Sequence, residues 1–113
     1  MKMWAVEVSY YYGEEAPQHR LETDVKLCRT REAAVVELER VIREDWTAEV
    51  RVGPDYKLKP LADMRGQSEM EDDSKWSDWC YTEDGETAWF FYGDTGYKGE
   101  VVEIKIAGVE AAV

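Results

Sequence analysis

Histidine and cysteine, the side chains that most often supply nucleophiles, general bases or zinc ligands, are scarce in this sequence. His19 is the only histidine, and it lies beside Arg20 in a segment that also contains Pro17. Cys28 and Cys80 are far apart and show no CxxC spacing, and the chain has no Gly-x-Ser-x-Gly elbow. The pattern argues against a Ser–His or Cys–His nucleophile and against a zinc site. It predicts two free thiols in a reducing compartment.

Carboxylates are plentiful, and carboxylates can perform acid–base catalysis or bind calcium. A glycosidase-like mechanism needs two carboxyl groups a short distance apart in a cleft, and a chain of 113 residues with one expected helix leaves little room for a cleft. The cluster Glu69-x-Glu71-Asp72-Asp73 lacks the ligand spacing, central glycine and final glutamate of an EF-hand. A small carboxylate-based enzyme is therefore kept as an alternative, and we expect no catalytic residue, metal or cofactor.

One glycine pattern also invites a nucleotide-binding interpretation. Gly93, Gly96 and Gly99 form G-x-x-G-x-x-G, but this segment lies between two expected strands. No helix N-terminus follows it to hold phosphates, so the pattern does not indicate a nucleotide site.

The negative charge of the chain is concentrated in one segment. The formal net charge is −11, and residues 66–94 contain nine acidic residues against the single base Lys75, a net charge of −8. Residues 1–65 have a net charge of only −2, and residues 95–113 a net charge of −1. Such a balance disfavours direct binding to nucleic acid or to an anionic membrane and favours a basic protein surface as the partner.

Two tryptophans, Trp76 and Trp79, stand among these acids and are of the residue type that dominates binding hot spots. We therefore predict a partner-binding surface made of the segment's acids and these tryptophans: Glu69, Glu71, Asp72, Asp73, Trp76, Asp78, Trp79, Glu83, Asp84, Glu86 and Asp94. The alternative is that the acids only keep the protein soluble while the tryptophans fill the core. For Trp4, Trp46, Trp89 and Phe90 we expect core positions.

The N-terminal half predicts two strands and a helix. Residues 3–12 and 21–28 alternate with period two, which indicates two antiparallel strands joined by a long loop around Gly13–Pro17. Thr30 is a good N-cap, and an apolar stripe at helical spacing predicts a helix from Arg31 to Asp45 that packs on the sheet: Val35, Leu38, Ile42 and Trp46.

The C-terminal half predicts further strands. Residues 49–52 read as a short edge strand and residues 66–75 as an acidic mobile loop. Strands are expected near Trp79–Tyr81, at 87–92 and at 101–106, with a type I′ turn at Asp84-Gly85 and a frayed tail over 107–113. The 87–92 strand has apolar groups on both faces, which is typical of a central strand or of one whose outer face is a contact surface.

These elements predict one α+β domain over residues 1–113. We expect an antiparallel sheet of about five strands with one main helix on one face, in the order β-β-α-(β)-β-β-β. No apolar run reaches the length of a signal peptide or a membrane span, which predicts a cytoplasmic protein without a membrane partner. The oligomeric state is left open by the sequence.

In its small size, its acidity and its lack of motifs, the whole chain resembles small phage-encoded anti-defence proteins, anti-CRISPR proteins among them. The resemblance implies a non-enzymatic inhibitor, in some cases a nucleic-acid mimic, that blocks a nuclease or a guide-RNA surveillance complex in the host cytoplasm. It assigns no individual residue. The alternative binding function is that of an antitoxin or immunity protein that neutralises one cognate toxin.

Overall fold

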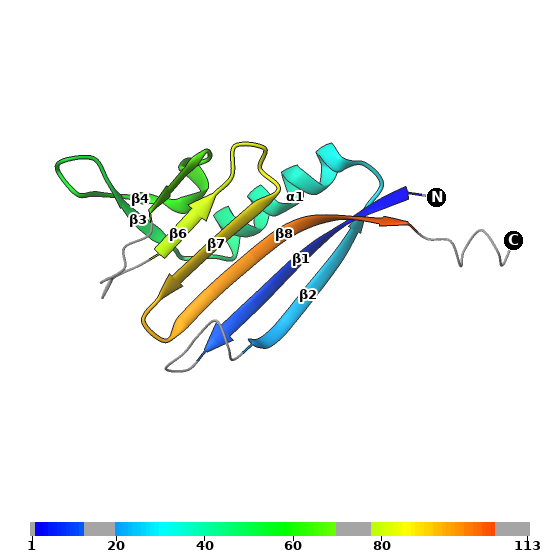
Figure 1. The fold of residues 1–113 in the computed structure, drawn as a ribbon, viewed down its shortest axis with the longest axis horizontal. Coiled ribbons are helices and arrows are strands. Elements are labelled where there is room, and N and C mark those ends of the chain that lie inside the picture. The colour runs from blue at the N-terminus through cyan, green and yellow to red at the C-terminus, as the bar shows by residue number, and fades with distance from the viewer. Residues whose placement is uncertain (1, 13–19, 70–77, 106–113) are drawn as a thin grey trace, which may run out of the picture.

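The computed structural model describes residues 2–12, 20–69 and 78–105, which form an α+β fold (Figure 1). A six-stranded antiparallel sheet carries one α-helix, and a separate two-stranded hairpin lies beside them. The elements, in chain order, are β1 (Lys2–Tyr12), β2 (Arg20–Cys28), α1 (Arg31–Glu44), β3 (Glu49–Val52), β4 (Lys57–Pro60), the 3₁₀ turn η2 (Leu61–Asp63), β5 (Gln67–Glu69), β6 (Asp78–Tyr81), β7 (Thr87–Tyr92) and β8 (Thr95–Lys105). The predicted fold class is confirmed.

The strand order in the large sheet is β2-β1-β8-β7-β6-β5, and every neighbouring pair is antiparallel. Strand β8 lies between the N-terminal hairpin β1–β2 and the C-terminal hairpin β6–β7, and it therefore joins the two halves of the chain (Figure 1). It is longer than predicted, because it begins at Thr95 and includes two of the three glycines of the G-x-x-G-x-x-G pattern.

Helix α1 matches its prediction closely. Thr30 Oγ1 accepts a hydrogen bond from the Ala33 N–H at 3.1 Å, and Asp45 is the C-cap. The apolar stripe of the helix lies on one face of the sheet, where Leu38 is fully buried. The core between them contains Val6, Val8, Ala34, Leu38, Val41, Ile42, Trp46, Val50, Leu61, Trp79, Tyr81 and Phe90, among others. Among the described residues, no helix has both the length and the apolar character that crossing a bilayer requires.

Gly99 allows the helix to approach the sheet. A Cβ atom at this position would lie 2.5 Å from Leu38 Cδ1 and 3.5 Å from Trp46 Cζ2. Gly96, on the opposite face of β8, makes room for Phe91 in the same way, since a Cβ there would lie 2.1 Å from Phe91 Cδ1. Gly93 has a φ of +58° in the two-residue turn between β7 and β8. The glycine pattern therefore has a steric explanation.

Two local predictions are wrong, and a third, the short strand, is confirmed. The acidic mobile loop predicted for residues 66–75 is contradicted at its start by a strand, β5, which follows Gly66, whose φ is +84° and whose N–H donates to the Tyr81 carbonyl at 2.7 Å; residues 70–75 lie outside the described residues. Residues 49–52 form the predicted short strand, β3, which pairs with β4 in a hairpin separate from the large sheet. Asp84 does not have the positive φ that a type I′ turn requires, because five residues, 82–86, separate β6 from β7, and the Thr82 N–H donates to the Thr87 carbonyl to close a four-residue turn, 83–86.

The large sheet has two different faces. The face that packs against α1 is the inner face, and the opposite one is called the outer face below. On β2, Cys28 lies opposite Trp4 and packs against the core, whereas Val25 and Leu27 lie on the outer face and are 56% and 51% exposed. The predicted strand is confirmed, but its apolar side chains point away from the core.

Candidate binding surface

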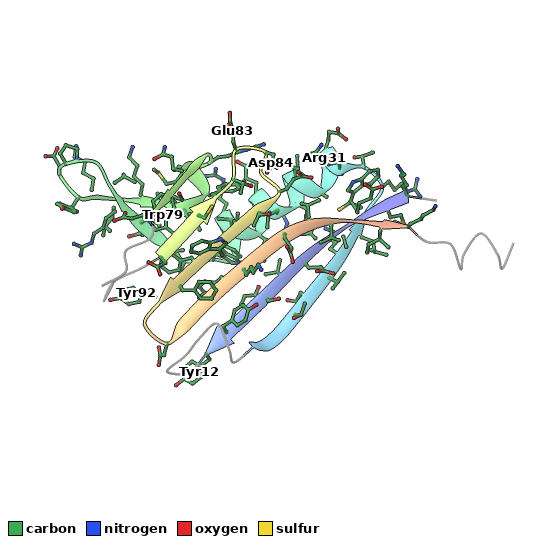
Figure 2. The ribbon with its side chains drawn as sticks, in the orientation of Figure 1. Tyr12, Arg31, Trp79, Glu83, Asp84 and Tyr92 are labelled. Carbon is green, nitrogen blue, oxygen red and sulfur yellow. The ribbon has the colours of Figure 1, made fainter. Side chains whose placement is uncertain are left out.

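The predicted acidic residues that the structure describes do not gather into one surface. Glu83, Asp84 and Glu86 lie in the loop at one end of the β6–β7 hairpin, whereas Asp78 and Asp94 lie at its other end. The two strands, of four residues in β6 and six in β7, separate these ends by roughly 13–20 Å. Figure 2 shows Glu83 and Asp84 near Arg31, at the start of α1, with Tyr92 far from them. The remaining predicted residues of the segment 70–77, Glu71, Asp72, Asp73 and Trp76, lie outside the described residues.

The loop 83–86 is held in place by its own side chains. Asp84 Oδ1 accepts hydrogen bonds from Thr82 Oγ1 at 2.7 Å and from the Glu86 N–H at 2.9 Å, and these bonds lower the pKa of the Asp84 carboxyl. Glu86 accepts from Arg31 Nε at 2.6 Å in a two-bond ion pair, which raises the Arg31 pKa. The charge of Glu86 is therefore neutralised within the chain, and Glu83 and Asp84 are the exposed acids at this end.

The predicted role of Trp79 as a surface anchor is contradicted. Its side chain is 2% exposed and lies on the inner face, opposite Phe90 and within the core. Trp46 and Phe90 are buried as expected, and Trp4 is half-buried against the core. The core prediction for Trp89 is wrong, because this side chain lies half-exposed on the outer face of the sheet.

The outer face contains a hollow of about 510 Å³, to which three aromatic rings contribute. Its lining residues come from strands β1, β6, β7 and β8: Tyr11, Asp78, Thr87, Trp89, Phe91, Lys98 and Glu100. The rings contact one another, with centroid distances of 5.5 Å between Tyr11 and Phe91 and 5.9 Å between Phe91 and Trp89. Because Gly96 has no side chain, the Phe91 ring can lie over the backbone of β8 and complete this aromatic row.

The charges around the hollow are mostly negative. Asp78 and Glu100 line it, and Glu7 lies directly opposite Glu100 on β1. Among the described residues that line the hollow, Lys98 is the one cation, and it lies directly opposite Trp89, so these four groups have a net charge of −2. In the described part of the chain neither Glu7 nor Glu100 has an ion-pair partner. Two like charges directly across a strand pair destabilise a sheet, so a cation bound here would relieve a repulsion that is already present.

The spacing of the carboxylates does not suit acid–base catalysis in the hollow. Asp78 and Glu100 lie two strands and four residue positions apart, which corresponds to roughly 16 Å between their Cα atoms. Retaining and inverting glycosidases need carboxyl groups about 5 Å and about 6.5–9.5 Å apart, respectively. Glu7 and Glu100 are close neighbours, but Glu7 does not line the hollow.

The two cysteines are free, as predicted, and their positions explain why. Cys28 lies on β2 and faces the core, whereas Cys80 lies on β6 and faces the outer side, opposite Trp89. Four strand spacings separate β2 from β6, about 19 Å, which is far beyond the reach of a disulfide. Burial raises the pKa of the Cys80 thiol. Across residues 2–12, 20–69 and 78–105, no three His, Cys, Asp or Glu side chains gather as metal ligands.

The sequence pattern contained one signal for the hollow, the paired aromatic residues Trp89 and Phe91 on one side of their strand. Tyr11, Lys98 and Glu100 were missed, because they join these rings only through the strand order that places β8 between β1 and β7. Comparison with known protein families, with curated proteins and with solved structures finds no match to this chain.

Proposed function

We propose that the protein is a non-enzymatic binding protein whose outer sheet face receives a cationic side chain of a basic partner. The observation that carries the proposal is the hollow itself, in which Tyr11, Trp89 and Phe91 lie beside the carboxylates of Asp78 and Glu100. Aromatic faces attract cations through their negative π surface, and nearby carboxylates supply the counter-charge. The proposed contact surface thus differs from the sequence-based one, which relied on Trp79.

An arginine side chain fits this chemistry best. A guanidinium group is planar, so it can stack on the Trp89 ring while its N–H groups donate to a carboxylate at the rim. Lys98, directly opposite Trp89, also lines the hollow, so the guanidinium must find its counter-charge at the rim carboxylates, away from this lysine. The three rings are partly covered by their neighbours, which keeps water away from the contact, as is typical of binding hot spots.

The wider charge distribution supports a basic, nucleic-acid-handling partner. The exposed acids Glu83, Asp84 and Asp94 extend negative charge to both ends of the β6–β7 hairpin. A net charge of −11 attracts a basic groove over a distance and accelerates encounter at low salt. We therefore propose an inhibitor that acts in the cytoplasm by occupying the nucleic-acid groove of a nuclease or a guide-RNA surveillance complex.

Binding of an arginine-rich peptide and of its citrulline counterpart, measured by calorimetry, tests the proposed site. Glu100→Lys should weaken binding of the arginine peptide by about tenfold or more, because it places a like charge in the hollow. The matched control is Glu49→Lys on β3, which changes the net charge equally but lies on another element. Weakening by about twofold or less is expected for the control.

Two outcomes would overturn the site. Equal losses in Glu100→Lys and Glu49→Lys would mean that only net charge matters, and tight binding of the citrulline peptide would mean that the guanidinium charge is not recognised. The partner class is tested separately by capture from host lysate at low and high salt. Salt-insensitive capture of a toxin without a nucleic-acid groove would instead support the antitoxin function.

A further inference from the structure

Strand β2 forms one edge of the large sheet, and it is unusually open for a strand of nine residues. Within the described part of the chain it pairs only with β1, so half of its backbone N–H and C=O groups face away from the sheet. Its residues Thr23 to Leu27 are all exposed, and they include the apolar side chains of Val25 and Leu27. A long, exposed edge with apolar side chains is a template for pairing with another strand.

Charged side chains on the inner face often prevent such pairing, and residues 23–27, the exposed part of β2 whose side chains the structure describes, include two, Asp24 and Lys26. Their signs are opposite, however, and they stand on either side of Val25. If two copies of β2 pair antiparallel about a twofold axis at Val25, each Asp24 lies directly opposite the other copy's Lys26. Centring the pair on Asp24 or on Lys26 would place like charges opposite each other, so the charges select one register.

The ion pairs within the chain are compatible with this arrangement. Lys26 Nζ lies 3.2 Å from Glu37 Oε2 of α1, but Glu37 is also paired with Arg40, so the lysine shares this carboxylate with a second cation. Asp24 has no ion-pair partner among the residues that the structure describes. A second copy would supply the missing cation, and on the outer face it would place Val25 against Val25 and Thr23 against Leu27.

We propose that two copies of the chain associate through their β2 edges in this Val25-centred register, giving one continuous antiparallel sheet. The proposal does not depend on the proposed function, because β2 contributes no residue to the hollow on the outer face. Since the twofold axis is perpendicular to the sheet, both helices lie on one side of the dimer and both hollows open on the other. The dimer would thus present two cation-binding hollows in the same direction.

Charge reversal at the two positions tests the register. In sedimentation experiments at physiological ionic strength, the wild-type chain of 13.1 kDa should sediment as a dimer. Asp24→Lys and Lys26→Asp should each weaken dimerisation by about tenfold or more, because each places like charges opposite each other. An equimolar mixture of the two variants should form a heterodimer of wild-type affinity, since both charge pairs are then attractive. Circular dichroism verifies that each variant is folded, and Glu49→Lys is the control for net charge.

Cysteine crosslinking provides a second measurement that does not depend on charge. Val25→Cys should form an intermolecular disulfide under mild oxidation, because this residue would lie opposite itself, whereas Thr23→Cys should not. A wild-type monomer at concentrations of roughly 100 μM, an unchanged dimer in Asp24→Lys, failure of the mixture to associate, or equal crosslinking at positions 23 and 25 would each overturn the proposal.

Discussion

The packing of Leu38 against Gly99 allows a quantitative test of how the helix is seated on the sheet. In Gly99→Ala the new methyl group would lie 2.5 Å from Leu38 Cδ1, and Leu38 is fully buried and cannot turn toward solvent. Overpacking of this kind costs about 1–3 kcal/mol. Removing a glycine from a strand returns about 0.5–1 kcal/mol. We therefore expect Gly99→Ala to lower the free energy of unfolding by about 1–2 kcal/mol.

The same contact predicts a strong coupling between the two positions. Leu38→Ala alone should cost about 2–5 kcal/mol, because it leaves a cavity between α1 and β8. In the double variant the methyl group introduced at position 99 occupies part of that cavity and no longer meets Cδ1. The double variant should thus be at least as stable as Leu38→Ala, which corresponds to a coupling free energy of about 1–2 kcal/mol.

Urea denaturation of the four proteins, followed by tryptophan fluorescence and by circular dichroism, measures this cycle. Equal slopes against urea concentration would show that the four transitions can be compared. If the two single losses add to within about 0.5 kcal/mol, Leu38 and Gly99 are independent and the proposed seating of the helix is refuted.

Three further predictions concern the outer face and the acidic loop. Gly96→Ala should displace the Phe91 ring and weaken binding of the arginine-rich peptide, as measured by calorimetry. In urea denaturation this variant should lose less stability than Gly99→Ala. Unchanged peptide binding would contradict the role of the aromatic row. Asp84 has a lowered pKa, so its ionised form stabilises the fold above about pH 4 and this contribution disappears as the pH falls through the folded-state pKa. Asp84→Asn should therefore be less stable than the wild type in thermal denaturation at pH 7, and the difference should shrink toward pH 3; a constant difference would contradict this. Because burial raises the pKa of the Cys80 thiol, this thiol should react with iodoacetamide near pH 8 more slowly in the folded chain than in the urea-unfolded chain. The two rates are measured by mass spectrometry in a Cys28→Ser background. Equal rates would contradict the described position of Cys80.

The parts of the fold that the sequence predicted well are those controlled by neighbouring residues. The bounds of α1 follow from the Thr30 cap and the apolar stripe, and the strand pattern of residues 3–12 follows from strict alternation. The errors arise where pairing between segments distant in the sequence determines on which face of the sheet a side chain lies. Trp79 and Trp89 have similar local surroundings, and only the pairing of β6 with β7 determines that one faces the core and the other the outer side.

The candidate site was predicted in chemical character but not in position. Acidic and aromatic residues were expected to act together, and Asp78 is common to the predicted and the observed surface. Tyr11 and Glu100, by contrast, belong to strands β1 and β8 at opposite ends of the chain, and these strands become neighbours only in the folded sheet. Such proximity leaves no periodic signal in the sequence.

The position of β8 between β1 and β7 has a consequence for synthesis on the ribosome. Strands β1 and β7, which flank β8 in the sheet, both leave the exit tunnel before β8 does. Until β8 emerges, the β1–β2 hairpin has an unpaired edge at β1 and the β6–β7 hairpin has one at β7. The contacts that β8 then makes with β1 join the most distant described segments of the chain, and contacts of that kind form slowly. The sheet is therefore completed only after translation has passed Lys105, and the waiting hairpins are the stage at which a chaperone would bind the chain.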